Sequence, residues 1–213
     1  MMNCRWDAIK AAFSDLANCK LGQETYLADD PSGLLDAEKV PVTEQGGTQI
    51  GLPNMLRLQS IKFRGEDGGH ISFSPVLPPD GQAALDFYFV GKKICARHGF
   101  DFHAGFHLYP HHMIHLNLLY FDNTSNSQKK AAELCFFELL ASARKHGYSE
   151  YRTHLNFMDA VSDQFDFNDH IHRRFVEQLK DCIDPNGILA PGKCGVWPKQ
   201  YRMGKCVKKQ SKL

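Results

Sequence analysis

The chain has 213 residues, which allows one domain, or one domain and part of another. Hydrophobic residues make up 43% of it, enough to bury a core, so the composition excludes a disordered tail. The formal net charge is +1, from 25 basic and 24 acidic residues, and gives no reason to expect nucleic acid or a membrane as partner.

Seven cysteines are scattered along the chain without a Cys-x-x-Cys pair. This odd number and wide spacing argue against a disulfide framework and against a zinc ribbon, and fit a reducing compartment. No apolar run approaches the length of a membrane span. There is also no G-x-G-x-x-G or P-loop pattern, so we expect nothing in these residues to hold a dinucleotide alone.

The first predicted element is an amphipathic helix over residues 5–18, where apolar side chains recur at helical spacing. Residues 20–54 are rich in Gly, Pro, Asp and Thr and are typical of a long irregular connection. Alternation of apolar and polar side chains then predicts a strand over Leu56–Phe63. A second strand, His70–Val76, is expected after two glycines.

A helix is expected next, with Asp80 as its N-cap and Gly99 as its stop signal after about His98. Two strands follow near residues 100–109 and 112–121, because aromatic and aliphatic side chains dominate both segments.

The C-terminal part begins with a strongly periodic helix over Ser127–His146. Short helices are expected near residues 157–164 and 168–182, followed by a turn-rich terminus. The order of strands and helices predicts an α+β fold, an antiparallel sheet with helices on one face.

Tyr151 and Arg152 are candidates for binding a phenolate. Ionising a phenol of pKa about 10 at neutral pH requires a shift of about 3 units, or about 4 kcal/mol. A fixed positive charge supplies about 1–3 units, and a hydrogen bond to the anion adds to that. The guanidinium of Arg152 stays charged on burial, and the Tyr151 hydroxyl can donate. Taken alone, however, the dipeptide fits a surface position, or an ion pair of Arg152 with Glu150, better.

The run E-Y-R-T-H-L-N-F-M-D at residues 150–159 is followed by N-G-I-L-A-P-G-K at residues 186–193 and G-V-W-P at residues 195–198. These runs resemble the C-terminal end of flavoprotein oxidases of the vanillyl-alcohol oxidase family, which oxidise para-substituted phenols. The similarity covers about residues 55–201, with a weaker echo in residues 5–13. In that family the Tyr-Arg pair binds the substrate phenolate, and this role carries over to Tyr151 and Arg152, with Arg152 also close to the cofactor.

The resemblance also implies three further cofactor residues. His70 stands where histidyl-flavin members attach FAD covalently, and a neutral imidazole is a competent nucleophile near pH 7. Taken alone, a histidine after two glycines equally fits a turn or a packing role. Lys193 is expected to contact the cofactor, with a solvated lysine as the alternative. His115 is expected near the flavin or an adjacent interface.

A cluster of histidines invites comparison with a metal site. Its members are His103, His107, His111, His112 and His115. A spacing of four would place ligands on one helical face, as zinc requires, but Pro110 interrupts and the surrounding residues favour strands. We therefore expect no metal site, and keep a histidine-cluster metal protein as an alternative.

The architecture that the resemblance implies is a two-part flavoprotein. Residues 1–147 would form much of the cap domain over the flavin, and residues 148–213 a C-terminal segment of the FAD-binding domain. The remainder of that domain and a catalytic carboxylate would lie upstream of Met1. We therefore expect this chain to be inactive alone, and the full-length enzyme to form a homo-oligomer.

The implied reaction is hydride transfer from a para-substituted phenolate to FAD, followed by reoxidation by O2 to give hydrogen peroxide. The alternatives are a dehydrogenase of the 4-cresol methylhydroxylase type and a flavin-free binding or scaffold protein derived from the cap domain. Ser211-Lys212-Leu213 is the tripeptide that the peroxisomal import receptor reads at a C-terminus. It predicts a peroxisomal location, which suits an enzyme that releases peroxide.

Overall fold

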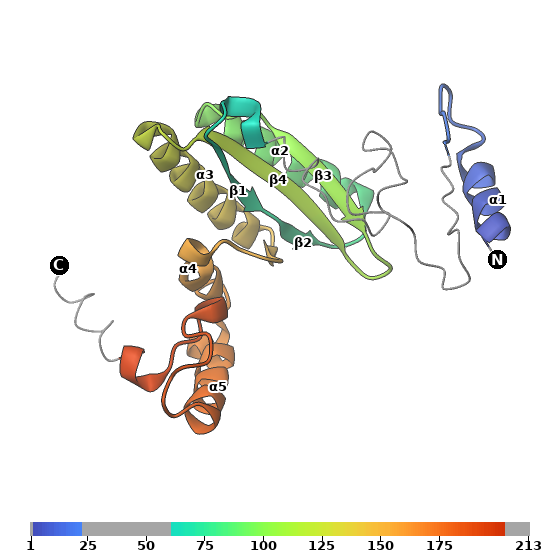
Figure 1. The fold of residues 1–213 in the computed structure, drawn as a ribbon. Coiled ribbons are helices and arrows are strands. Elements are labelled where there is room, and N and C mark those ends of the chain that lie inside the picture. Colours follow the sequence, from blue (N-terminus) through green and yellow to red (C-terminus); the bar gives the residue numbers. More distant parts are fainter. Residues whose placement is uncertain (1, 23–60, 203–213) are drawn as a thin grey trace, which may run out of the picture. The chain divides into compact units, whose positions relative to one another are not determined.

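The computed structural model describes residues 2–22 and 61–202, and the chain divides into two compact units, residues 1–57 and 58–213. The described part of the first unit holds helix α1, Met2–Phe13 (Figure 1). The helix predicted over residues 5–18 therefore begins earlier and ends earlier than expected. Most of the predicted connection, and the peroxisomal tripeptide Ser211-Lys212-Leu213, lie outside the described residues.

The second unit is built on a five-stranded antiparallel sheet (Figure 1). Its strands are β1 (Gly68–Phe73), β2 (Pro75–Leu77), β3 (His103–Leu108), β4 (Met113–Asp122) and β5 (Ser149–Glu150). The long strand β4 pairs with β3 along one edge and with β1 and β2, one after the other, along its other edge. Strand β5 completes the sheet by pairing with the free edge of β2.

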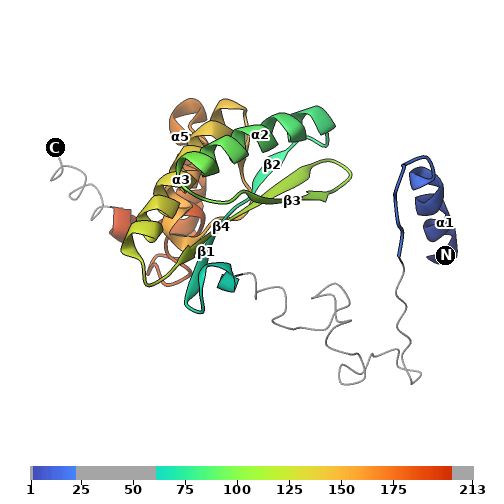
Figure 2. The ribbon, with the colours of Figure 1, turned by 90° about the horizontal axis from the view of Figure 1, so that it is seen from above.

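Helices α2 (Gly81–Arg97) and α3 (Asn126–Lys145) both lie on one face of this sheet, as Figure 2 shows. Each starts at a side chain that accepts a hydrogen bond from its first turn, Asp80 for α2 and Ser125 for α3. Gly99 follows α2 at φ 76°, the left-handed conformation that ends a helix. The predicted α+β fold, an antiparallel sheet with helices on one face, is confirmed.

The core fills the space between the sheet and these two helices. Its centre is a group of fully buried rings, Phe73 on β1, Phe87 on α2 and Phe136 on α3. Phe73 meets Phe136 edge to face, with ring centroids 5.6 Å apart. Phe157, which follows β5 in the chain, stacks on Phe136 and so attaches the C-terminal segment to the same core.

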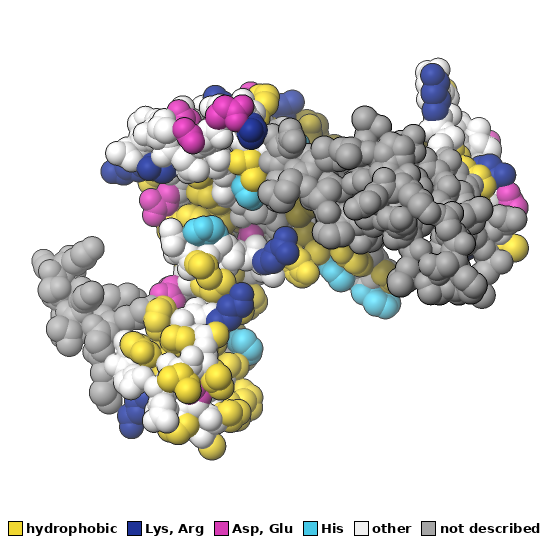
Figure 3. Space-filling model, viewed as in Figure 1, with side chains coloured by type: hydrophobic (Ala, Val, Ile, Leu, Met, Phe, Trp, Pro, Cys, Tyr) yellow, Lys and Arg dark blue, Asp and Glu magenta, His cyan; other side chains and the backbone are white. Residues whose placement is uncertain are grey.

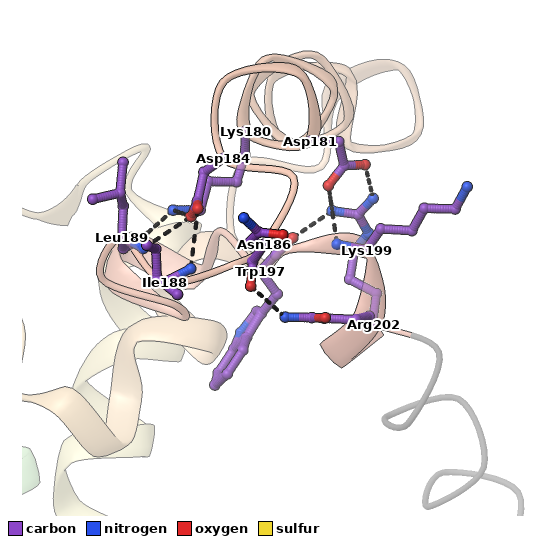
Figure 4. Close-up of polar contacts among 10 residues, drawn as sticks. Lys180, Asp181, Asp184, Asn186, Ile188, Leu189, Trp197, Lys199 and Arg202 are labelled. Carbon is purple, nitrogen blue, oxygen red and sulfur yellow. Dashed lines mark hydrogen bonds and ion pairs between the residues drawn. The ribbon is translucent and has the colours of Figure 1, made fainter.

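After β5 the chain forms η4 (Leu155–Phe157), α4 (Met158–Ser162), α5 (Phe167–Ile183) and η5 (Lys193–Gly195). The loop after α5 is held by two carboxylates of that region (Figure 4). Asp184 accepts hydrogen bonds from the backbone N–H groups of Ile188 and Leu189, at 3.0 and 2.9 Å. Asp181 forms an ion pair with Arg202. These bonds fix the path of the chain toward η5.

The strand predicted over Leu56–Phe63 is wrong for its described residues, 61–63, which lie in a 3-10 turn; residues 56–60 are not among the described ones. The turn closes where the N–H of Gly65 donates to the carbonyl of Lys62 at 3.0 Å. Gly65 has φ 124°, a conformation that a strand could not continue.

The single strand predicted over His70–Val76 is divided at Ser74 into β1 and β2. Pro75 has no N–H to donate to a ladder, and both backbone groups of Ser74 bond to the segment around β5 instead. The break between β1 and β2 therefore leaves the backbone of Ser74 free to bond to the segment of Glu150 and Tyr151.

Strand β5 lies just past the predicted domain boundary at residue 147, yet it pairs with β2 of the sheet. The division into residues 1–147 and 148–213 stays a prediction. Within residues 2–22 and 61–202, no helix combines the length and the apolar character needed to cross a membrane.

Candidate functional site

A pocket of about 320 Å³ opens at the end of β5, and we call it the Tyr-Arg pocket. Its walls come from residues 150–153, from α4 and α5, and from η5. Tyr151, Arg152 and Lys193 all line it. The structure thus brings together three of the predicted site residues, two of which are next to each other in the chain and one of which is about forty residues away.

The segment that carries Tyr151 and Arg152 is fixed to the sheet at Ser74. The Tyr151 N–H donates to the Ser74 carbonyl at 2.8 Å. The Ser74 N–H in turn donates to Oε1 of Glu150 at 2.9 Å. The break between β1 and β2 therefore supplies the donor and the acceptor that hold the Tyr-Arg segment in place.

The Tyr151 side chain is 59% exposed, and Arg152 is exposed as well. Arg152 forms no ion pair or hydrogen bond with any other residue of the described ranges. The ion pair with Glu150, which the sequence left open, is therefore not formed. Both the guanidinium and the phenol hydroxyl are available to an anion that enters the pocket.

Glu150 is a residue of this pocket that the sequence did not identify as functional. Its side chain is only 9% exposed, and Oε2 is buried without a hydrogen-bond partner among the described residues. Burial raises the pKa of this carboxyl to about 8, although the hydrogen bond from the Ser74 N–H acts in the opposite direction. Burial therefore favours the protonated form of Glu150 near neutral pH. The two-residue strand β5 offers no alternation from which its inward position could have been read, because that position follows from the pairing with Pro75 of β2.

His70 lies away from the Tyr-Arg pocket, on β1, in a groove of about 530 Å³. His154, Lys129 and Lys130 line the same groove. Partial desolvation, and secondly the nearby His154, lower the pKa of His70. The lowered pKa favours the neutral imidazole, the form that a nucleophilic nitrogen requires.

His115 is fully buried between β4 and α2. Its ring lies 4.9 Å from that of Phe106 and meets Phe87 edge to face at 5.6 Å. Neither ring nitrogen has a hydrogen-bond partner among the described residues, and burial lowers the pKa of His115 to about 4. A contact of this side chain with the flavin stays a prediction.

The clustered histidines point to different places. His103 packs on Tyr120, with centroids 5.4 Å apart, and His112 stacks on Tyr109 at 4.7 Å. In the part of the chain that the structure describes, no three His, Cys, Asp or Glu side chains are grouped so that they could hold a metal ion. The geometry gives no support to the alternative of a histidine-cluster metal protein.

Comparison with known proteins connects this geometry to a family. The model of "FAD linked oxidases, C-terminal domain" matches residues 64–194. The chain is 29% identical over 177 residues to the 4-cresol dehydrogenase (hydroxylating) flavoprotein subunit of Pseudomonas putida, covering 83% of this chain and 32% of that protein.

Two solved structures are similar in fold and in sequence. One is 4-ethylphenol oxidase from Gulosibacter chungangensis in complex with isoeugenol, with a TM-score of 0.68 and 35% identity, covering 71% of this chain and 29% of that one. The other is p-cresol methylhydroxylase with substrate bound, with a TM-score of 0.64 and 30% identity, covering 73% and 31%. The chain thus spans about a third of the length of these relatives. The predicted kinship with phenol-oxidising flavoproteins is confirmed: this chain belongs to the FAD-linked oxidases, whose C-terminal domain it contains.

Proposed function

We propose that this chain supplies the phenol-binding side of an FAD-dependent oxidoreductase that acts on para-substituted phenols. The observation that carries the proposal is the Tyr-Arg pocket, which is lined by Tyr151 and by Arg152, a side chain without a partner among the described residues. The names of the relatives, 4-ethylphenol oxidase and p-cresol methylhydroxylase, support the substrate class.

In this proposal Arg152 and Tyr151 bind the substrate as its phenolate. The guanidinium lowers the pKa of the bound phenol, and the Tyr151 hydroxyl donates a hydrogen bond to its oxygen. The apolar wall of the pocket, from Met158, Val161 and Phe165, excludes water from the ring. Binding therefore fixes the orientation of the ring as well as its charge.

FAD, when bound, supplies the chemistry by accepting a hydride from the benzylic carbon of the phenolate. Loss of that hydride converts the phenolate into a neutral quinone methide, which takes up water to give the benzylic alcohol. For an oxidase, O2 would take a hydride equivalent from the reduced flavin and one proton from the medium, and leave as hydrogen peroxide. His70, which lines its groove and whose lowered pKa favours the neutral imidazole, is proposed as the covalent attachment point of the cofactor, with Lys193 and His115 as further contacts.

The outer surface of α5 suits a chain that packs against an FAD-binding part. Apolar side chains gather over this region in Figure 3. Four of them lie four residues apart along one side of the helix: Ile171, Phe175, Leu179 and Ile183, of which Ile183 is 73% exposed. Phe167, 82% exposed, precedes the left-handed residues at the start of α5. Such an apolar stripe is typical of a helix that contacts another domain or subunit.

The proposal is tested on the protein purified from its own cells, together with any FAD-binding part that accompanies it there, because we expect residues 1–213 alone to be inactive. Denaturation followed by intact-mass measurement is expected to find flavin retained covalently, and a His70→Ala variant is expected to lose it. Anaerobic addition of 4-ethylphenol is expected to bleach the flavin absorbance of the native protein. Hydrogen peroxide formed on admitting O2 then identifies an oxidase, whereas turnover only with an added electron acceptor identifies a dehydrogenase. A native protein with neither flavin nor affinity for the phenol would overturn the proposal.

A further inference from the structure

Glu150 and Arg152 line the same pocket but do not form an ion pair with each other. One oxygen of Glu150 accepts the Ser74 N–H at 2.9 Å, and the other is buried without a partner among the described residues. Among the described residues, a carboxyl in this position has no second donor that would stabilise it when it ionises. Within the pocket, a side-chain cation that can move to the carboxylate is the group that could pair with it.

A protonated carboxyl exerts only a weak pull on a guanidinium, whereas an ionised one attracts it strongly at low dielectric. Ionising Glu150 would leave a buried charge unpaired, which is costly unless a cation moves to it. The long side chain of Arg152 is attached two residues away and is held by no other described group. Glu150 and a bound phenolate would then compete for the same guanidinium.

We propose that Glu150 is a positioning residue for the phenol-binding site: it leaves Arg152 free for the phenolate only while its carboxyl is protonated. This inference rests on the proposed function, because it assigns the pocket to a phenolate. Ionisation of Glu150 then sets the pH above which phenolate binding no longer improves. The buried carboxyl thus has a role beyond accepting the hydrogen bond from Ser74.

Other ionisable groups face the same pocket and must be separated from this effect. Tyr151 is on the segment of Glu150 itself, His172 comes from α5, and Lys193 and Cys194 come from η5. The parts of α4 and β2 that lie beside Glu150 contribute only uncharged side chains. Among the described residues that line this pocket, Lys193 is the other cation with a comparably flexible chain, so it provides the matched control.

Binding of 4-ethylphenol to the 213-residue chain, followed through the absorption band of the phenolate, tests the inference. Because a phenol of pKa about 10 supplies about tenfold more phenolate per pH unit, its affinity should improve about tenfold per unit at first. Around pH 8 that gain should stop in the unmodified chain, because each further unit leaves correspondingly fewer protonated Glu150 carboxyls. In Glu150→Gln, whose amide does not ionise but can still accept from Ser74, the improvement should continue toward about pH 10.

A variant that levels off at the same pH as the unmodified chain overturns the inference. If neither protein increases the phenolate band above that of free 4-ethylphenol at any pH, the proposed function fails instead. The inference then still has a test that needs no phenol, the carbon-13 NMR titration of the Glu150 carboxyl, whose signal is assigned by its loss in Glu150→Gln.

In that titration Arg152→Ala is expected to raise the midpoint of Glu150, because the ionised carboxyl loses the cation that pairs with it. Lys193→Gln removes a positive charge from the same pocket and is expected to leave the midpoint in place. A midpoint that Arg152→Ala does not move, or that Lys193→Gln moves instead, contradicts the assignment of Arg152 as the partner.

Discussion

The rings of Phe136 on α3 and Phe157 on η4 stack with their centroids 4.1 Å apart and their planes inclined by 18°. Phe157 is 3% exposed, so this stack is part of the core rather than a surface contact. Because Phe157 follows Tyr151 and Arg152 closely in the chain, it holds the far end of the pocket segment, as Ser74 holds the near end.

We expect Phe157→Ala to lower the free energy of unfolding by about 3–5 kcal/mol, as for other buried phenylalanines. The urea midpoint at constant pH measures this loss. Phe137→Ala is the matched control, because Phe137 contacts the same ring edge to face at 5.4 Å but is 40% exposed. Equal losses for the two variants would show that Phe157 is not a core residue.

The stability of the protein should depend on the ionisation of Glu150. Its folded-state pKa of about 8 lies above the ordinary value of 4.5, so the folded protein binds this proton more tightly than the unfolded chain. The contribution is therefore fully present below about pH 4.5 and is lost as pH rises toward 8, by up to about 1.4 kcal/mol per unit. Urea unfolding at several pH values should show this loss in the unmodified chain and a flatter profile in Glu150→Gln. An unchanged slope in the variant would refute the assignment.

His115 should give the opposite pH dependence. Its folded-state pKa of about 4 lies below the ordinary 6.5, so the unfolded chain takes up the proton first as pH falls. The stability that neutral His115 provides is present above about pH 6.5 and is lost as pH falls toward 4. His115→Phe keeps an aromatic ring in the core and cannot titrate. We expect it to lower the midpoint pH of acid unfolding, and an unaltered midpoint would count against burial of a neutral imidazole.

Gly192→Ala should disturb the η5 wall of the Tyr-Arg pocket. Gly192 has φ 83°, and an added Cβ would lie 2.4 Å from Cζ2 of Trp197. The Trp197 indole N–H donates to the Asp159 carboxylate at 2.7 Å, so the ring cannot move without breaking that bond. A reduced melting temperature and altered tryptophan fluorescence are expected. Gly81→Ala, where an added Cβ meets nothing within 4 Å, should leave both unchanged.

A peroxisomal location remains a proposal, carried by Ser211-Lys212-Leu213. A fusion that carries a fluorescent protein ahead of Met1 should be found in peroxisomes. Deletion of Leu213 should leave this fusion in the cytosol. The same distribution with and without Leu213 would exclude this signal as the address.

Local rules of the sequence were enough to predict most of the sheet-and-helix layer. Asp80 marks the start of α2 and Gly99 its end, because an N-cap side chain and a left-handed glycine act on the backbone nearest to them. The same rules did not predict the left-handed residues at the start of α5. The residues from Asn168 to His170 have φ between 46° and 56°, and the Arg174 side chain donates to the carbonyls of Asn168 and Asp169 there. Contacts between a side chain and a backbone carbonyl do not recur at a regular spacing, so a search for periodic patterns in the sequence does not find them.

For the site, sequence similarity brought attention to Tyr151, Arg152 and Lys193, and the fold places them in one pocket. Glu150 could not be identified in the same way. Its burial depends on pairing with Pro75, more than seventy positions earlier in the chain, and on the break at Ser74. Only the three-dimensional register shows that this carboxyl faces inward.

The pairing of Pro75 with Glu150 also affects the chain while it is being synthesised. Strand β2 is complete long before β5 emerges, so its outer edge is without a partner strand for that time. Proline offers no N–H along that edge, and β2 is only three residues long. Such an edge is a poor template for pairing with a neighbouring chain, so the unfinished sheet is protected from aggregation until its last strand arrives.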